Sequence, residues 1–253
     1  MRTAVPYGAD TLTADVDWAE PLGVIEVADA PELEDVEEGV RAALEHPIGL
    51  ERSVFELVRP GETVAVVVSD AFRQTRADRF LPVLVNGLND VGIPDDRIRI
   101  IFATGTHRAP TPVEQAAILG PEMYRRLGAR AVVHNAHDEA NLEYVGTTRR
   151  GTVVRINRHA LACDRLIATG AVVLHYFGGF GGGRKSIVPG IAAAETIARN
   201  HANNLDPVSD RLNPDVRIGV LDGNPVAEDM MEAARLVQVD FILNTVLNRD
   251  AQI

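Results

Sequence analysis

The chain has 253 residues, of which 46% are hydrophobic and 24% are charged, and its formal net charge at pH 7 is −11. These values are ordinary for a soluble globular enzyme that is large enough to bury one sizeable core. The acidic excess argues against nucleic acid and an anionic membrane surface as partners, because no basic surplus is available to neutralise phosphates. A small anionic substrate stays compatible with this charge if a few arginines gather locally.

Cysteine content and the N-terminus bear on the cellular compartment. The single cysteine, Cys163, excludes an intrachain disulfide and a multi-cysteine metal site, and its apolar neighbours predict an inert buried thiol. The first residues lack the apolar run of a signal peptide, and no apolar run reaches the length of a membrane span. We therefore expect a cytoplasmic protein.

The first sixty residues differ in pattern from the rest and are expected to form an irregular α+β lead-in. They include an acidic stretch around Glu32–Glu38 that is typical of a solvated face. From residue 61 to 253, short apolar β-branched runs alternate with helical patterns. The predicted strands are Thr63–Ser69, Ile98–Ala103, Ala131–His134, Arg165–Leu174, Val216–Leu221 and Phe241–Leu247. The predicted helices are Arg79–Leu88, Pro112–Leu127, Ala192–Asn200 and Pro225–Leu236.

This alternation predicts an α/β fold with a mostly parallel sheet flanked by helices. Several strands are apolar almost throughout, as is typical of parallel strands covered on both faces. The helix from Pro112 has a clear start, with Thr111 as the N-cap and Glu114 completing a capping box. The last residues read as a strand entering a turn, where a returning strand would begin, so we expect that a second domain is missing.

In open parallel sheets ligands bind beyond the carboxyl ends of the strands, and three segments of interest fall there. Asp70 and Arg73 follow the first strong strand; Asp70 could cap the next helix, whereas Arg73 could pair with a carboxylate ligand. His107 follows the next strand, where an imidazole suits general acid–base work, although a surface histidine fits equally well. The third segment is a glycine-rich loop that begins near His175.

This loop, residues 174–190, is the most informative stretch of the chain. Five glycines within six residues let the backbone approach a ligand closely, with His175 at one end and Lys185 at the other. We expect it to hold a cofactor, because ordering so many glycines costs entropy that a function must offset. The spacing before Lys185 departs from that of P-loops, and a desolvated lysine could instead be a covalent attachment point. His201, near the end of the next helix, could turn toward the loop or simply pack or cap.

Taken together, these segments resemble the nickel-pincer lactate racemase family, in order over most of the chain. The motifs that carry the resemblance are Ser69-Asp70-x-x-Arg73, Ala103-Thr104-Gly105-x-His107-Arg108, His175-Tyr176-Phe177, Gly182-Gly183-Arg184-Lys185-Ser186-Ile187-Val188-Pro189-Gly190, Asn200-His201 and Gly223-Asn224-Pro225. Each motif alone is weak, whereas their order and spacing together are specific. The resemblance implies that residues 1–253 are the Rossmann-like, cofactor-binding N-terminal catalytic domain of a two-domain isomerase.

The resemblance also implies a cofactor, the nickel-pincer nucleotide (pyridinium-3,5-bisthiocarboxylic acid mononucleotide nickel). Lys185 would carry it through a thioamide, and His201 would be the protein ligand of the nickel. Gly182, Gly183 and Arg184 would be further cofactor-binding residues. Soft sulfur donors in a roughly square-planar arrangement suit Ni(II). The enzymes that make this cofactor would be partners of the protein.

The reaction implied by the resemblance is the racemisation or epimerisation of a small 2-hydroxy acid. His107 and His175 would stand on opposite sides of the substrate, and one would remove the hydroxyl proton while hydride passes from C2 to the cofactor. The planar keto acid could then take hydride back on either face. Arg73 would hold the substrate carboxylate, and Asp70 would orient a catalytic histidine.

Departures from the family pattern and two other hypotheses stay open. Phe72 and Gln74 stand where family lactate racemases tend to have threonine and proline, and Gly181 stands where serine is common, which leaves lactate, malate and other 2-hydroxy acids as candidate substrates. The glycine loop and Lys185 could instead serve a nucleotide- or phosphate-binding module without hydride chemistry. A third hypothesis is a metal-dependent hydrolase; its metal ligands would be His134, His137 and Asp138.

Overall fold

The computed structural model describes residues 2–8, 10–20, 22–23, 28–209 and 211–253. They belong to two compact units, 1–30 and 31–253. The first unit contains an antiparallel hairpin of β1 (Arg2–Tyr7) and β2 (Asp10–Asp15), whose apolar side chains are exposed. A two-stranded hairpin encloses no core of its own, so its backbone ladder is the main interaction that holds these strands together.

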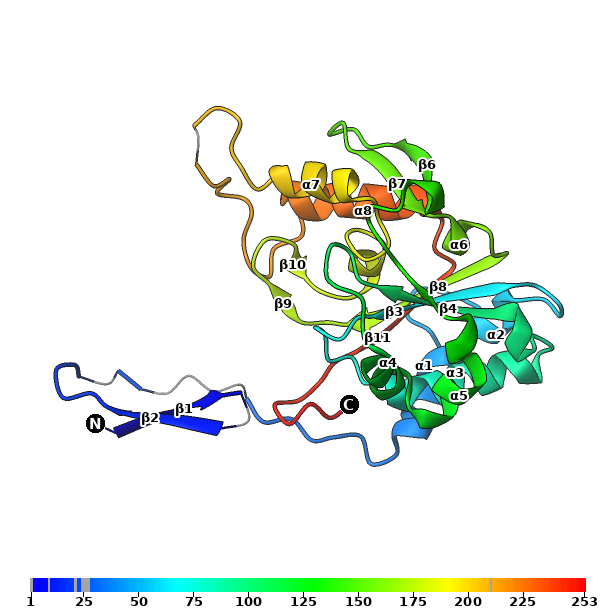
Figure 1. Ribbon diagram of the computed structural model, residues 1–253, viewed down its shortest axis with the longest axis horizontal. Helices are drawn as coiled ribbons and strands as arrows, with labels where there is room; N and C mark the ends of the chain where they lie inside the picture. The colour runs from blue at the N-terminus through cyan, green and yellow to red at the C-terminus, as the bar shows by residue number, and fades with distance from the viewer. Residues whose placement is uncertain (1, 9, 21, 24–27, 210) are drawn as a thin grey trace. The chain divides into compact units, whose positions relative to one another are not determined.

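The second unit is built on a five-stranded, wholly parallel sheet (Figure 1). In spatial order its strands are β11 (Phe241–Thr245), β8 (Arg165–Ala171), β3 (Val64–Ser69), β4 (Ile98–Ala103) and β5 (Val132–Val133). Read from the β5 edge, this is the 3-2-1-4-5 order of a Rossmann sheet. The predicted α/β class with a mostly parallel sheet is confirmed. The strand order reverses between β3 and β8, and such switch points are where these sheets bind ligands.

The uninterrupted apolar run of β3 is explained by burial on both of its faces. Val64, Val66 and Val68 pack into one core, and Ala65 and Val67 pack into the other. The helices of the first face are α1 (Val36–Glu45), α2 (Val54–Leu57), α3 (Ala77–Asp90), α4 (Pro112–Leu119) and α5 (Pro121–Leu127). The second face carries α6 (Arg158–Leu161), α7 (Ala194–Ala202) and α8 (Pro225–Val237), and Figure 1 shows α7 and α8 on the side of the sheet opposite α1 to α5.

Shorter elements complete the second unit. Two antiparallel hairpins are formed by β6 (Leu142–Thr147) with β7 (Val153–Asn157) and by β9 (Leu174–His175) with β10 (Gly179–Phe180). Four 3-10 turns are η1 (Asp95–Arg97), η2 (Gly128–Arg130), η3 (Glu139–Asn141) and η4 (Gly183–Ser186). Across the described ranges, every helix is too short or too polar to pass through a lipid bilayer.

Three sequence predictions about elements are corrected. Val216–Leu221 is not a strand: it forms turns, and its Gly219 N–H donates to the Gly179 carbonyl at 3.0 Å instead of joining a sheet. The helix predicted over Pro112–Leu127 is interrupted at Gly120, because this residue precedes a proline and takes an extended ψ with a positive φ of 78°. The strand predicted over Arg165–Leu174 ends at Ala171.

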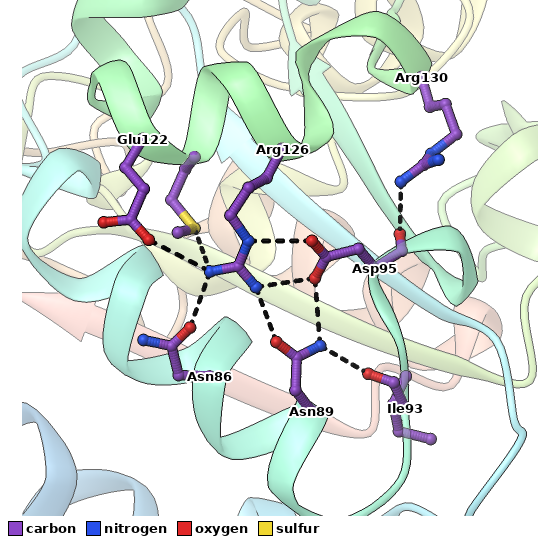
Figure 2. A network of polar contacts seen from close by, with 8 residues as sticks. Asn86, Asn89, Ile93, Asp95, Glu122, Arg126 and Arg130 are labelled. Carbon is purple, nitrogen blue, oxygen red and sulfur yellow. Dashed lines mark hydrogen bonds and ion pairs between the residues drawn. The ribbon is translucent and has the colours of Figure 1, made fainter.

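One polar network connects α3 and α5, two helices of the first face, to the turn η1 before β4 (Figure 2). Arg126 on α5 donates to both carboxylate oxygens of Asp95, at 2.9 and 2.8 Å. The same guanidinium donates to the side-chain oxygens of Asn86 and Asn89 on α3, at 2.8 and 2.7 Å. The hydrogen bond from Arg126 lowers the pKa of Asp95 despite its partial burial. This bidentate pair holds α3, α5 and η1 in one arrangement.

A second network ties α7 and α8 to the turn between β6 and β7. Asp229 on α8 is 1% exposed and accepts hydrogen bonds from Thr148 Oγ1 at 2.5 Å, Thr152 Oγ1 at 2.8 Å and Asn200 Nδ2 at 2.8 Å. A buried carboxylate is tolerated only when such donors satisfy it. Because Asn200 immediately precedes His201, the network also fixes the helical turn that carries this histidine.

We expect Asp229→Ala to lower the free energy of unfolding by about 3 kcal/mol, because three donors lose a buried acceptor. Urea denaturation followed by circular dichroism measures this difference. Asp90→Ala, at the exposed end of α3, is the matched control and should change the free energy by less than about 0.5 kcal/mol. An Asp229→Ala effect as small as that of the control would mean that the network adds no net stability.

Candidate active site

The carboxyl ends of the central strands bring together segments that lie far apart in the sequence. Asp70 follows β3, His107 lies in the turn after β4, and residues 172–190 follow β8. The backbone joins the last two, since the Gly105 N–H donates to the Gly190 carbonyl at 2.9 Å. The candidate site therefore lies at the switch point of the sheet, where ligands of Rossmann-like folds bind.

His107 is held by a buried carboxylate. Its Nδ1 lies 2.6 Å from Oδ2 of Asp70, which is 3% exposed, and the other oxygen of Asp70 accepts the Phe72 N–H at 3.0 Å. The His107 side chain is 45% exposed. Because a carboxylate can only accept, Nδ1 carries the hydrogen of this bond, and Nε2 of the neutral ring keeps a free lone pair. The arrangement suits a general base whose conjugate acid is stabilised by Asp70.

Phe72 and Arg73 line the same side of the site. The Phe72 ring meets His107 edge-on, with 4.8 Å between centroids, and Arg108 lies over Phe72 at 5.2 Å. Arg73 is exposed, and the side-chain hydrogen bond described for it goes to the Phe72 carbonyl at 3.2 Å. Burial is the main cause that lowers the pKa of both His175 and Lys185, and the positive charge of Arg73 adds to this effect.

The glycine-rich segment folds back against its own sheet with no space for side chains. A Cβ on Gly170 of β8 would lie 2.9 Å from the Cα of Gly182, and a Cβ on Gly182, where φ is +73°, would lie 2.7 Å from Oδ1 of Asn244. The same Oδ1 accepts the Gly183 N–H at 3.0 Å, and the Ser186 hydroxyl donates to a β8 carbonyl at 2.5 Å. These glycines are therefore required by close packing within the chain, which positions η4 beneath the site.

Three candidate residues surround one ring, that of Phe177. The ring centroid lies 5.4 Å from Nζ of Lys185, 4.5 Å from the His175 ring and 4.6 Å from the His201 ring. The Phe177 carbonyl accepts a hydrogen bond from Nδ2 of Asn224 at 2.9 Å. The structure thus brings the tethering lysine, one catalytic histidine and the metal-ligand histidine of the sequence hypothesis into one cluster.

Lys185 has an altered acidity. Burial, followed by the positive charges of Arg73 and Arg184, lowers the pKa of Lys185 to about 7. A substantial share of its amine is then uncharged near neutral pH, which is the nucleophilic form. Lys185 is also the only lysine in the chain, since every other residue counted as Lys or Arg is an arginine. Arginine is therefore the side-chain cation used elsewhere, and the one side-chain primary amine of the sequence lies in this site.

His175 and His201 are both kept neutral by their surroundings. Burial, then the charges of Lys185 and Arg73, lowers the pKa of His175 to about 4, and its Nδ1 accepts the Gly178 N–H at 3.1 Å. Burial also lowers the pKa of His201, although the Ile197 carbonyl opposes the shift. Nδ1 of His201 is buried and makes no hydrogen bond of ordinary geometry with the described residues. A neutral imidazole of this kind can serve as a metal ligand.

Arg184, next to Lys185 on η4, contacts the glycine-rich loop. It is 8% exposed, and its Nη2 donates to the Gly178 carbonyl at 2.6 Å. Its Nε is buried and lacks a partner among the described residues. Burial lowers the pKa of Arg184, and no carboxylate of the described chain forms an ion pair with it.

The histidine cluster proposed for a hydrolase does not form a metal site. Both ring nitrogens of His134 are engaged, with Nε2 2.9 Å from the Ala192 carbonyl and Nδ1 3.1 Å from Nδ2 of Asn157. His137 is exposed. Within the described ranges, no group of three or more His, Cys, Asp or Glu side chains is arranged to hold a metal ion. His134 is a buried structural residue, and the hydrolase hypothesis is wrong on this point.

Some residues that shape the site carried no role in the sequence analysis. Phe177 and Asn224 lie within motifs of the resemblance, but their contacts with each other could not be read from spacing. Asn224 is also the N-cap of α8, accepting the N–H groups of Val226 and Ala227. Asn244 was read only as part of a strand. The signal that was present and unused is the single lysine among many arginines.

Comparisons with known proteins identify the family of this chain. The family model described as the lactate racemase N-terminal domain matches residues 7–211. Proteins named lactate racemase from Thermoanaerobacterium thermosaccharolyticum and Lactiplantibacillus plantarum are each 34% identical, over 251 and 252 residues. Each match covers 98% of this chain and 57% of the relative, so the chain spans little more than half the length of these proteins.

Solved structures give the same result. The structure of the lactate racemase apoprotein from Thermoanaerobacterium thermosaccharolyticum matches with a TM-score of 0.82 and 33% identity, covering 100% of this chain and 57% of that one. A protein of Thermotoga maritima shares the fold, with a TM-score of 0.65 and 21% identity over 89% of this chain and 54% of that one. From the family model and the two curated relatives, we conclude that the chain belongs to the lactate racemase N-terminal domain family.

Proposed function

We propose that residues 1–253 form the N-terminal catalytic domain of a cytoplasmic racemase or epimerase that acts on a small 2-hydroxy acid. The observation that carries the proposal is the cluster around Phe177, in which an amine with a pKa of about 7 stands beside two neutral imidazoles. The names of the relatives support the reaction class. Its partners would include the enzymes that make its cofactor.

The residues of the cluster fit the nickel-pincer nucleotide. Lys185 offers an uncharged amine for covalent attachment, and His201 offers a neutral ring that packs on the same Phe177 side chain. Gly182, Gly183 and Arg184 would be the neighbouring cofactor-binding residues. When bound, this group would supply two-electron oxidation and reduction at C2 of the substrate.

The chain itself would handle the proton and the carboxylate. Nε2 of His107 has a free lone pair that can take the hydroxyl proton, and Asp70 stabilises the imidazolium that forms. His175 is fixed through Nδ1 by a backbone N–H, which leaves Nε2 for proton exchange with the opposite face of a planar keto acid. Arg73 would hold the substrate carboxylate, because guanidinium and carboxylate pair through two parallel hydrogen bonds.

Lys185→Arg tests covalent attachment. In cells that make the cofactor, the parent chain should carry a nucleotide-sized adduct on Lys185 together with nickel, and the variant should carry neither, because a guanidinium cannot form the thioamide. Intact-mass and peptide mass spectrometry with metal analysis measure both. Since arginine keeps the positive charge, a module that bound phosphate without a covalent link would keep most of its affinity. An unmodified Lys185 in cofactor-competent cells would contradict the proposal.

The acidity of Lys185 can be measured directly, because the only other amine in the chain is its N-terminus. Competitive acetylation read by mass spectrometry should give a midpoint near pH 7, about three units below that of an ordinary lysine. Arg73→Gln should raise this midpoint, since it removes a nearby positive charge. Arg125→Gln, at an exposed position on α5, should leave it unchanged. An ordinary lysine midpoint in the parent chain would refute the buried-amine assignment.

The two-histidine assignment predicts separate losses of rate and cofactor. In the cofactor-loaded protein, His107→Ala and His175→Ala should each reduce racemisation by about 10²- to 10⁴-fold, the usual contribution of a general acid–base, while adduct and nickel are retained. His137→Ala, which alters an exposed histidine, is the matched control and should keep the parent rate. Near-parent rates for either catalytic variant in both directions would show that the assignment is wrong.

A further inference from the structure

A cavity of about 610 Å³ lies beside the candidate active site and shares Arg184 with it. It is bordered by the turn between β6 and β7, by α8 and by residues 221–222. Its volume is within the range of about 300–1,000 Å³ that is typical of small-molecule sites. Its charged lining consists of Arg149, Arg150, Arg184, Arg235, Asp222, Glu228 and Glu232, and its apolar lining consists of Leu221, Ala227 and Met231.

The charges in this cavity do not cancel. Arg150 pairs with Glu228 at 2.9 Å, and Arg149 pairs with Glu232 at 3.4 Å. Arg184 and Arg235 then remain against the single carboxylate of Asp222, and neither forms an ion pair with any residue of the described ranges. In a chain with a net charge of −11, an excess of arginine around one cavity indicates a site for an anion.

Arg184 is the residue that most needs an anionic partner. Its side chain is buried, with 8% of the residue exposed. It donates one hydrogen bond, to a backbone carbonyl, and its Nε has no partner among the described residues. A buried, unpaired cation is unfavourable unless a ligand of opposite charge completes its surroundings. The carbonyl belongs to Gly178, and a Cβ on that residue would lie 3.4 Å from Nδ1 of His175 and 3.8 Å from Cδ of Lys185. Gly178 therefore contacts Arg184 through its carbonyl and lies close to His175 and Lys185.

We propose that this cavity binds the phosphate group of a phosphate monoester, with Arg184 as the principal ligand and Arg235 at the rim. Guanidinium groups match phosphate oxygens in both geometry and charge, and the phosphate would pair with the two arginines that have no carboxylate partner. The apolar lining leaves room for the organic part of the ligand. The phosphate has two possible sources. One is the tethered nucleotide, an assignment that rests on the proposed function, and the other is a free metabolite. The proposal of a phosphate site does not depend on which source applies.

Isothermal titration of the unloaded chain with adenosine 5′-monophosphate and with adenosine tests the site. The monophosphate should bind and adenosine should not. Arg184→Gln should weaken binding about tenfold or more, the effect of a lost charge-assisted hydrogen bond. Arg235→Gln changes an exposed residue and should leave the fold intact while weakening binding about two- to fivefold. Asp222→Asn should tighten binding, because it removes a negative charge from the cavity.

Arg125→Gln lies outside the cavity and should leave the affinity unchanged. Equal binding of adenosine and its monophosphate, absence of binding, or equal affinities for Arg235→Gln and Arg125→Gln would overturn the proposal. Titration of inorganic phosphate into protein that carries the Lys185 adduct then separates the two sources. Loss of phosphate binding on loading assigns the cavity to the nucleotide, and retained binding assigns it to a free metabolite. Because the first titrations use unloaded protein, failure to form the adduct would not affect them.

Discussion

The structure of the site depends on one close approach, the return of the segment after β8 to the end of its own sheet. The backbone of Gly182 packs against the backbone of Gly170 there. The side-chain oxygen of Asn244 accepts a hydrogen bond from the Gly183 N–H. Any side chain at these glycines would separate the surfaces. The turn η4 is thereby held in one position, with Lys185 over the Phe177 ring and Arg184 in the lining of the cavity bordered by α8.

This packing creates the electrostatics of the site. Burial reduces the solvation that stabilises the charged form of Lys185, and the positive charges of Arg73 and Arg184 disfavour that form further. Burial and these charges lower the pKa of Lys185 and of His175, which favours the uncharged amine and the uncharged ring. A nucleophile and an anion-binding surface thus arise from the same arrangement, because both follow from cations that lack carboxylate partners.

The two candidate acid–base histidines are held by different means. Asp70 accepts from Nδ1 of His107, so it supports a positive charge on that ring. A backbone N–H donates to Nδ1 of His175, so it supports the neutral ring. His201 is fixed indirectly, through Asn200 and the buried carboxylate of Asp229. Orientation of these side chains therefore depends on hydrogen-bond partners from the loop after β3, the glycine-rich loop, α7 and α8.

The sequence by itself determined the α/β class and the placement of candidate residues after β3, β4 and β8. Parallel strands buried on both faces have continuous apolar runs, and ligands bind at their carboxyl ends. The strands and the candidate residues that follow them can therefore be recognised from short stretches of sequence. The roles assigned to those residues came from the family resemblance. Only the tertiary structure decided which predicted strands pair and which histidines are free to bind a ligand. Val216–Leu221 has the composition of a strand but no neighbouring strand to pair with. His134 has the side chain of a metal ligand, but both of its ring nitrogens already contact Asn157 and a backbone carbonyl. Pairing, burial and pKa shifts depend on residues distant in the chain, and no local pattern records them.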